Sequence, residues 1–198
     1  APLLLPTQRM ATAVALEWDA QEGKIDPRTM PFTRSANAAI DKVHVQKAEV
    51  ADMLAEYGDS DLLCYRADTP QDLVDRQAAE WDPALEWAAD HLGTRLEVRQ
   101  GIVHQPQSPE AQASLTARVH ALTDFQLAAF HDLVSLSGSL ILGFAAANGW
   151  RDADEIWQIS RLDERWQAEK WGADEDAEAA ADVKRQAFIH AKRFFDLS

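Results

Sequence analysis

The side chains of this 198-residue chain that could carry chemistry do not form a catalytic pattern. The serines of SLSGSL, Ser135 to Leu140, lack the G-x-S-x-G spacing of a nucleophile elbow and lie inside a helical pattern. Small residues that let a neighbouring helix approach closely are the preferred explanation of this segment. The eight glycines form neither a phosphate-binding loop nor a dinucleotide fingerprint.

Metal-ligand spacings are also missing from the sequence. No H-x-x-x-H or E-x-x-H pair occurs, and Cys64 is the only cysteine, which excludes a disulfide within the chain and a thiolate zinc site. We therefore expect no metal, no cofactor and no small-molecule substrate. Titration with zinc, magnesium or ATP should show nothing tighter than about millimolar.

The segment SRLDERWQAEKWG, Ser160 to Gly172, carries the strongest signal, because its helical pattern has two apolar faces. One long helix is predicted from Asp152 to Trp171. One stripe has the spacing of a core-facing helix surface: Ile156, Ile159, Leu162 and Trp166. The second stripe places two tryptophans beside a carboxylate and an amide: Trp157, Ser160, Glu164, Gln167 and Trp171. This second face indicates contact with a partner, and burial of the helix between neighbours in its own chain is the alternative.

Two further observations concern this region. Asp163 falls on the core stripe, so we expect it to form a structural ion pair with an arginine or lysine. Seven tryptophans raise the expectation of a protein partner, because tryptophan is enriched at interface hot spots.

Composition limits the remaining function classes. With 33 acidic and 19 basic residues the net charge is −14 and the pI is near 4.7, which argues against nucleic acid and anionic membranes as partners. A hydrophobic content of 46% is typical of a folded protein. No run of 18 apolar residues is present, so no membrane insertion is expected.

The elements that must position these residues are mostly helices. Leu3 to Leu5 of APLLLPT read as the end of a strand with partners upstream, so we expect residues 1–31 to be the remnant of an N-terminal α/β domain whose upstream strands are missing. Its helix, from Thr7 to about Glu22, should pack on that sheet. Residues 32–198 are predicted to form a bundle of helices crossing at steep angles, so the fold class is mainly α with a small α/β part. The predicted helices of the bundle are 33–43, 44–57, 70–80, 83–92, 110–122, 124–147, 152–171 and 174–195, and the predicted strands are 62–66 and 95–103.

An ordered series of motifs resembles the ATP-twelve family, assembly chaperones for the α subunit of the ATP synthase catalytic sector. The motifs are EWDAQ (17–21), MPFTRSANAAID (30–41), DLLCYRA (61–67), RQAAEWDPALEW (76–87), HDLVSLSGSLILG (131–143) and SRLDERWQAEKWG (160–172). The resemblance extends from about Pro2 to Phe195, and the alanine-rich composition is closer to a bacterial than to a mitochondrial member.

The resemblance implies a non-catalytic chaperone without cofactor, which binds the newly made α subunit, prevents its aggregation and supports assembly of the catalytic sector. It implies a cytoplasmic location in a bacterium, or the mitochondrial matrix in a eukaryote. In the family, acidic positions of the C-terminal helices matter for function. The matching positions here are Asp163, Glu164, Glu175 and Asp176. Helical geometry favours Glu164 for an outward contact and Asp163 for an internal one, but either could carry the acidic role.

Two other function classes stay open at this point. An enzyme of hydrolase type with an unrecognised site would show convergent titratable groups in a concave pocket. A permanent structural subunit would bind the same partner as a chaperone, and only release distinguishes the two. An exposed apolar patch with an acidic rim would favour the chaperone.

Overall fold

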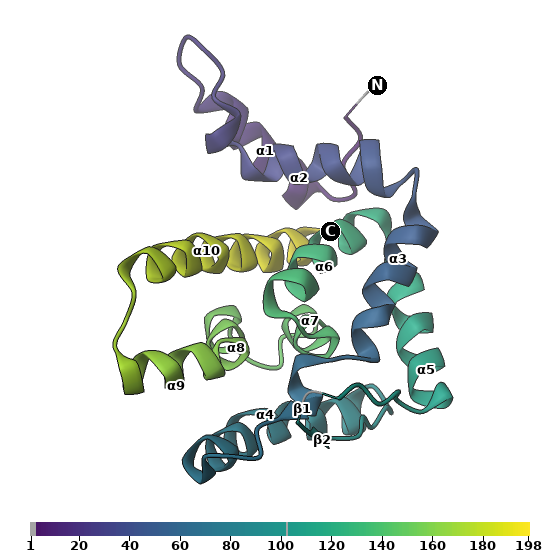
Figure 1. Cartoon of the computed structure of the whole chain (residues 1–198). Coiled ribbons are helices and arrows are strands. Elements are labelled where there is room, and N and C mark those ends of the chain that lie inside the picture. Colours follow the sequence, from purple (N-terminus) through teal and green to yellow (C-terminus); the bar gives the residue numbers. More distant parts are fainter. Residues whose placement is uncertain (1–2, 102) are drawn as a thin grey trace.

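The computed structural model describes residues 3–101 and 103–198, which form ten α-helices and one small sheet (Figure 1). The α-helices are α1 (Gln8–Asp19), α2 (Pro31–Ala38), α3 (Lys47–Ala55), α4 (Gln71–His91), α5 (Pro109–His120), α6 (Asp124–Ser137), α7 (Leu140–Ala147), α8 (Ala153–Ser160), α9 (Leu162–Trp171) and α10 (Glu175–Leu197). Shorter helical turns are η1 (Pro27–Thr29), η2 (Ala39–Val43), η3 (Glu56–Gly58) and η4 (Leu62–Cys64). The predicted fold class, mainly α with a small β part, is confirmed. No helix in the described part of the chain is long and apolar enough to cross a membrane.

The sheet consists of two parallel strands of two residues each, β1 (Tyr65–Arg66) and β2 (Arg99–Gln100). Both lie inside the predicted strands, which were far longer. The first is shortened because the Asp61 side chain accepts the N–H of Leu63 at 3.0 Å and turns the backbone into η4. Ile102, in the second predicted strand, lies outside the described residues.

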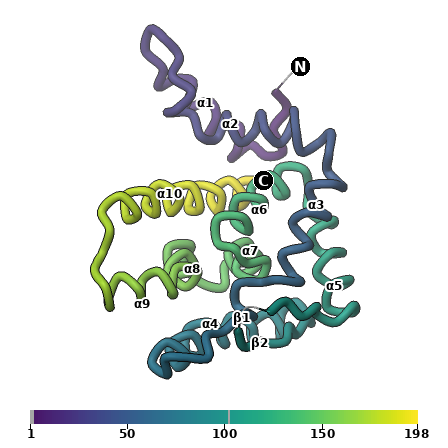
Figure 2. The backbone as a smooth tube through the Cα atoms, in the orientation of Figure 1, coloured from purple at the N-terminus to yellow at the C-terminus, as the bar shows by residue number. Residues whose placement is uncertain are grey.

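Helix α6 lies at the centre of the bundle and contacts α3, α7 and α10 (Figure 2). Its pattern of apolar residues explains this position, because Leu127, Phe130, Leu133 and Val134 are all buried. Helix α10 adds Phe188 to the same core. The first half of α10 extends past this core toward α9 (Figure 1).

The N-terminal helices pack on the bundle rather than on a sheet. The carboxylate of Glu17 in α1 accepts the N–H groups of Phe32 and Thr33, at 2.7 and 2.8 Å, and so caps α2. Met10 of α1 is buried in a small cluster with residues of α2, α6 and α10. No strand occurs among residues 3–31, so the expectation that α1 packs on a remaining sheet is corrected. The domain boundary at residue 31 stays a prediction.

Helix α4 continues through Pro83, where the sequence predicted an interruption. Proline removes one helical hydrogen bond, but residues on both sides bury against one core. Trp81 is fully buried and its Nε1 donates to the carbonyl of Ile159 at 2.9 Å, while Ala84 and Ala88 continue the same buried face. Tertiary packing therefore outweighs the local cost of the proline.

The predicted helix 124–147 is instead two helices. Gly138 ends α6 with φ of +72°, a left-handed conformation that favours glycine. Ser139 then caps α7 by accepting the N–H of Leu142 at 3.0 Å. Asp61, fully buried, accepts the Ser139 hydroxyl at 2.7 Å and the N–H of Ile141 at 3.0 Å. The serines and glycine of SLSGSL thus create a helix break secured by a buried carboxylate.

Candidate functional site

The segment with two apolar faces folds as two helices rather than one. Arg161 separates α8 from α9, with φ of −103° and ψ of 19°. The Ser160 hydroxyl donates to the carbonyl of Trp157 at 2.7 Å, a local hydrogen bond that competes with the helical one. Residues before and after Arg161 therefore do not share the angular register of one continuous helix.

The predicted partner-binding residues of these two helices nevertheless line one groove. Trp157 lies at its floor, is only 2% exposed and packs on Phe188 of α10 with ring centroids 5.8 Å apart. Trp157 is therefore a core residue, which corrects its assignment to an exposed stripe. Gln167 is exposed, and Trp171 is 74% exposed. The ring of Trp171 stands perpendicular to that of Trp166, with the ring centroids 5.5 Å apart.

Glu164 lines the same groove from α9. Its side chain is 49% exposed, and one oxygen lies 2.7 Å from Nη1 of Arg161, one turn earlier. The outward position that helical geometry favoured for Glu164 agrees with this exposure. The sequence alone identified neither Arg161 as the partner of Glu164 nor its place over the Trp157 ring, 5.7 Å from the centroid.

The groove has a volume of about 570 Å³ and runs between α8–α9 and the first half of α10. Its α10 wall combines small apolar side chains with charges: Ala177, Glu178, Ala181, Asp182 and Arg185. Arg185 is engaged by Asp154 and Asp182, so it offers little free positive charge. The groove is therefore lined by apolar and charged side chains together, and most of its charges are paired.

Free negative charge lies on the first turn of α10, where Glu178 lines the end of the groove and Glu175 and Asp176 lie next to it without lining it. Asp174 caps this helix, accepting the N–H groups of Asp176 and Ala177 at 3.0 Å each. Glu175, Asp176 and Glu178 are exposed, and within the described residues none of them forms an ion pair. The helix dipole stabilises acidic groups at this end, so their concentration costs the fold little.

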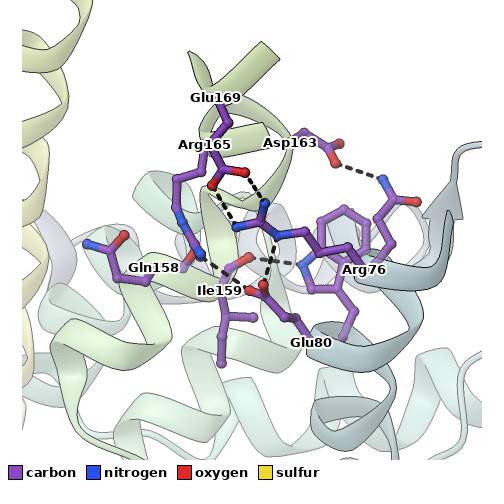
Figure 3. A network of polar contacts seen from close by, with 9 residues as sticks. Arg76, Glu80, Gln158, Ile159, Asp163, Arg165 and Glu169 are labelled. Carbon is purple, nitrogen blue, oxygen red and sulfur yellow. Dashed lines mark hydrogen bonds and ion pairs between the residues drawn. The ribbon is translucent and has the colours of Figure 1, made fainter. Parts of the chain in front are cut away.

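Asp163 has a different partner from the one predicted. It is half-buried and accepts a hydrogen bond from Nε2 of Gln77 at 2.7 Å, with no lysine or arginine within ion-pair distance among the described residues (Figure 3). The nearby guanidiniums are occupied by other carboxylates: Arg76 by Glu80 and Glu169, and Arg165 by Glu80. The predicted ion pair is thus corrected to a charged hydrogen bond with a buried amide.

An ionic network that the sequence did not predict attaches α9 to α4 (Figure 3). Arg76 holds both oxygens of Glu169, at 2.6 and 3.0 Å, and also Glu80 at 3.1 Å, while Arg165 reaches Glu80 at 3.2 Å. The Arg76 guanidinium lowers the pKa of Glu169. Lys170 pairs with Asp72 at 2.6 Å at the outer end of α9. Each helix carries Arg-x-x-x-Glu, a visible spacing, but nothing in the sequence shows that the two pairs face each other.

Apolar contacts contribute little to the attachment of α9. Only Leu162 and Trp166 of its ten residues are buried. The helix that presents Glu164, Gln167 and Trp171 is therefore held largely by partly exposed charges.

Two kinds of catalytic feature are missing from the described residues: a metal-binding cluster, and surface access to the Ser139–Asp61 pair. No group of three or more His, Cys, Asp or Glu side chains among them could hold a metal ion. The buried Ser139 and Asp61 pair has no exposed surface through which a substrate could reach it.

Comparisons with known proteins agree with this architecture. A family model described as ATP12 chaperone protein matches residues 1–89. The crystal structure of Atp12 from Paracoccus denitrificans is 49% identical, with a TM-score of 0.97, over 99% of this chain and 84% of that one. The crystal structure of the Atu1473 protein from Agrobacterium tumefaciens is 38% identical, with a TM-score of 0.93, over 100% of this chain and 74% of that one.

A curated relative is more distant. The mitochondrial protein atp12 of Schizosaccharomyces pombe is 28% identical over an alignment 178 residues long, which covers 85% of this chain. The chain spans about three fifths of that protein, 61% of its length. With the identity and coverage of the Paracoccus structure, these matches show that the chain belongs to the ATP12 chaperone family.

Proposed function

We propose that this protein is a non-catalytic chaperone that binds the newly made ATP synthase α subunit, prevents its aggregation and supports assembly of the catalytic sector. Membership of the ATP12 chaperone family supports the role in ATP synthase assembly. The α subunit as the client, and the bacterial cytoplasm (or the mitochondrial matrix) as the location, are the finer parts of this proposal.

The observation that carries the proposal is the groove between α8–α9 and α10 with its acidic end. Tryptophan is enriched at the hot spots of protein–protein interfaces, and Trp171 is 74% exposed at this groove. The unpaired carboxylates of the first turn of α10 lie beside it. Apolar side chains in the groove, together with its acidic end, suit a client segment whose apolar side chains are flanked by lysine or arginine.

We assign the client contacts by exposure, both within the groove and on the first turn of α10 next to it. Glu164, Gln167 and Trp171 contact the client from α9, and Glu175 and Asp176 contact it from α10. Trp157 supports the floor from below, since its ring is buried against α10.

Co-expression with an ATP synthase α subunit tests the proposal. We expect the α subunit to remain soluble and to be recovered in a pull-down with the parent protein. Glu164→Lys should reduce both, because a reversed charge inside an interface can cost several kcal/mol. The matched control is Glu86→Lys, which makes the same charge change at an exposed position of α4 outside the groove lining.

Addition of the β subunit distinguishes a chaperone from a permanent subunit. A chaperone should release the α subunit as the α–β contact forms, whereas a permanent subunit should stay in the complex. The client assignment fails if the α subunit aggregates equally with and without the parent protein.

A further inference from the structure

A second hollow lies away from the α9–α10 groove, where the C-terminal ends of α4, α5 and α7 meet α10. Its volume is about 710 Å³. Large apolar side chains form its walls: Trp87, Leu122, Phe144, Trp150 and Phe195. It has no lining residue in common with the α9–α10 groove.

The charge of this hollow is opposite to that of the molecule. The chain carries 33 acidic and 19 basic residues, yet no carboxylate lines the hollow, whereas Arg118 and His91 do. A hollow of about 620 Å³ adjoins it, because Gly149 lines both. Arg151, Lys192 and Arg193 line this second hollow.

The carboxylates of the adjoining hollow are already engaged. Asp196 pairs with Lys192, and Asp152 caps α8 by accepting the N–H of Asp154 at 2.8 Å. Neither Asp152 nor Asp196 therefore pairs with an arginine of the two hollows.

Three arginines at these hollows are exposed, and among the described residues none lies within ion-pair distance of a carboxylate: Arg118, Arg151 and Arg193. Arg151 lies over the Trp150 ring, with Cζ 4.3 Å from the ring centroid. Arg118 donates one Nη2 hydrogen bond to the carbonyl of Leu92 at 2.7 Å. A guanidinium that has no carboxylate partner can donate two parallel hydrogen bonds to a carboxylate of another molecule.

The loop that joins the two hollows is held in place by the backbone of α7. Trp150 N–H donates to the carbonyl of Ala145 at 2.9 Å, and Gly149 N–H donates to that of Ala146 at 3.1 Å. Gly149 has φ of +69°, which favours glycine at this turn. The aromatic and cationic groups are thus preorganised, which lowers the entropic cost of binding.

We propose that the two adjoining hollows form one docking site for a partner-protein segment that carries an aromatic or aliphatic anchor flanked by aspartate or glutamate. The anchor fills the hollow between Trp87 and Trp150, and the flanking carboxylates pair with Arg118, Arg151 and Arg193. Charge complementarity selects this occupant, because the net charge of −14 repels an acidic segment from most of the surface and these arginines attract it locally. The site is independent of the function proposed above.

Fluorescence anisotropy with labelled peptides of about ten residues tests the proposal. The probe has a central Phe-Leu pair between aspartates and glutamates. One matched peptide replaces every acid by lysine, and another replaces Phe-Leu by Ala-Ala. We expect saturable binding of the probe only, weakened at least about tenfold by loss of the anchor and absent with lysines.

Variants locate the binding. Arg151→Glu, and separately Arg193→Glu in case the first disturbs Trp150, should weaken the probe at least about tenfold. Lys24→Glu makes the same charge change at an exposed position in the loop after α1 and should leave binding nearly unchanged. Glu164→Lys, in the other groove, should not weaken it.

Several outcomes would overturn the proposal. These are equal weakening by Lys24→Glu and Arg151→Glu, equal binding of the lysine peptide, and no saturation of the probe below about 1 mM. Loss of probe binding in Glu164→Lys would place the acidic segment elsewhere.

Discussion

Asp163 and Glu164 are neighbours in α9, yet the structure predicts opposite consequences for their substitution. Asp163 accepts one hydrogen bond, from Nε2 of Gln77 at 2.7 Å, and Gln77 is only 2% exposed. Asp163→Ala therefore leaves a buried amide donor without its acceptor. A hydrogen bond to a charged group contributes about 1.5–3 kcal/mol, so we expect unfolding to become easier by about 2 kcal/mol. A fully buried ion pair, which the sequence predicted, would have implied about 3–5 kcal/mol.

Thermal unfolding measures this difference. For a domain of this size, about 2 kcal/mol lowers the melting temperature by about 4–8 °C. Asp163→Asn is the control, because the asparagine carbonyl can still accept from Gln77. This variant should melt within about 3 °C of the parent, a loss below about 1 kcal/mol.

Glu164→Lys should unfold nearly like the parent. The substitution removes the exposed pair with Arg161 and places a lysine near Arg161 and Arg165, effects of about 0.5 kcal/mol each on a helix surface. Its consequence should be seen in the aggregation assay with the α subunit, where protection should fall while Glu86→Lys protects normally.

The reasoning is refuted if Asp163→Ala melts with the parent, or if Asp163→Asn loses as much stability as Asp163→Ala. It is refuted for Glu164 if the lysine variant unfolds. If Glu164→Lys folds and still protects the α subunit fully, the α9–α10 groove does not bind the client.

Three further outcomes are expected. Burial raises the pKa of Asp61 from 3.8 to about 6, so its contribution to stability is complete below pH 3.8 and is lost as the pH rises through about 6. At about 1.4 kcal/mol per pKa unit, most of this contribution develops between about pH 7 and pH 4. The free energy of unfolding of the parent should therefore rise by about 2 kcal/mol relative to Asp61→Asn over that range, and parallel denaturation curves would contradict this. Arg76→Gln should speed amide hydrogen exchange over residues 162–171 at least about fivefold but leave exchange in α6 unchanged, and about 0.5 M salt should do the same to the parent. Equal protection of residues 162–171 in the variant, in the parent and in the parent with salt would show that apolar contacts hold α9. Calorimetric titration with zinc, magnesium or ATP should show no binding tighter than about millimolar, and stoichiometric tight binding would reopen the enzyme alternative.

Periodicity and capping signals predicted most helices because these signals act locally. Thr7, Asp152 and Asp174 each accept an N–H of the first turn of the helix that follows, as side chains at these positions do in many proteins. The misplaced boundaries depend on distant residues. Asp61 secures the break before α7 from about 80 residues away, at separations of 78 and 80 in sequence. No local signal around Gly138 reveals that carboxylate.

The candidate site was predictable only in part, for the same reason. The stripe Glu164, Gln167 and Trp171 follows from spacing within α9, and all three line the groove. Trp157 precedes the break at Arg161, so its exposure depends on how α8 packs on Phe188. The α10 wall and the network from Arg76 to Glu169 join segments far apart in the chain, and a single sequence contains no measure of their proximity.

The way α9 is attached has a consequence for a chaperone that must release its client. Exposed ion pairs contribute about 0–1 kcal/mol each, so the contacts of Arg76, Arg165 and Lys170 hold α9 without locking it. A helix held by a large buried apolar surface would resist movement, but only Leu162 and Trp166 of α9 are buried. If a client segment competes for the same charges, part of its binding free energy is offset by the contacts that it displaces. Its affinity is thereby limited, and its departure restores the original pairs. An ionic attachment of α9 is thus consistent with the reversible holding of a client that we propose.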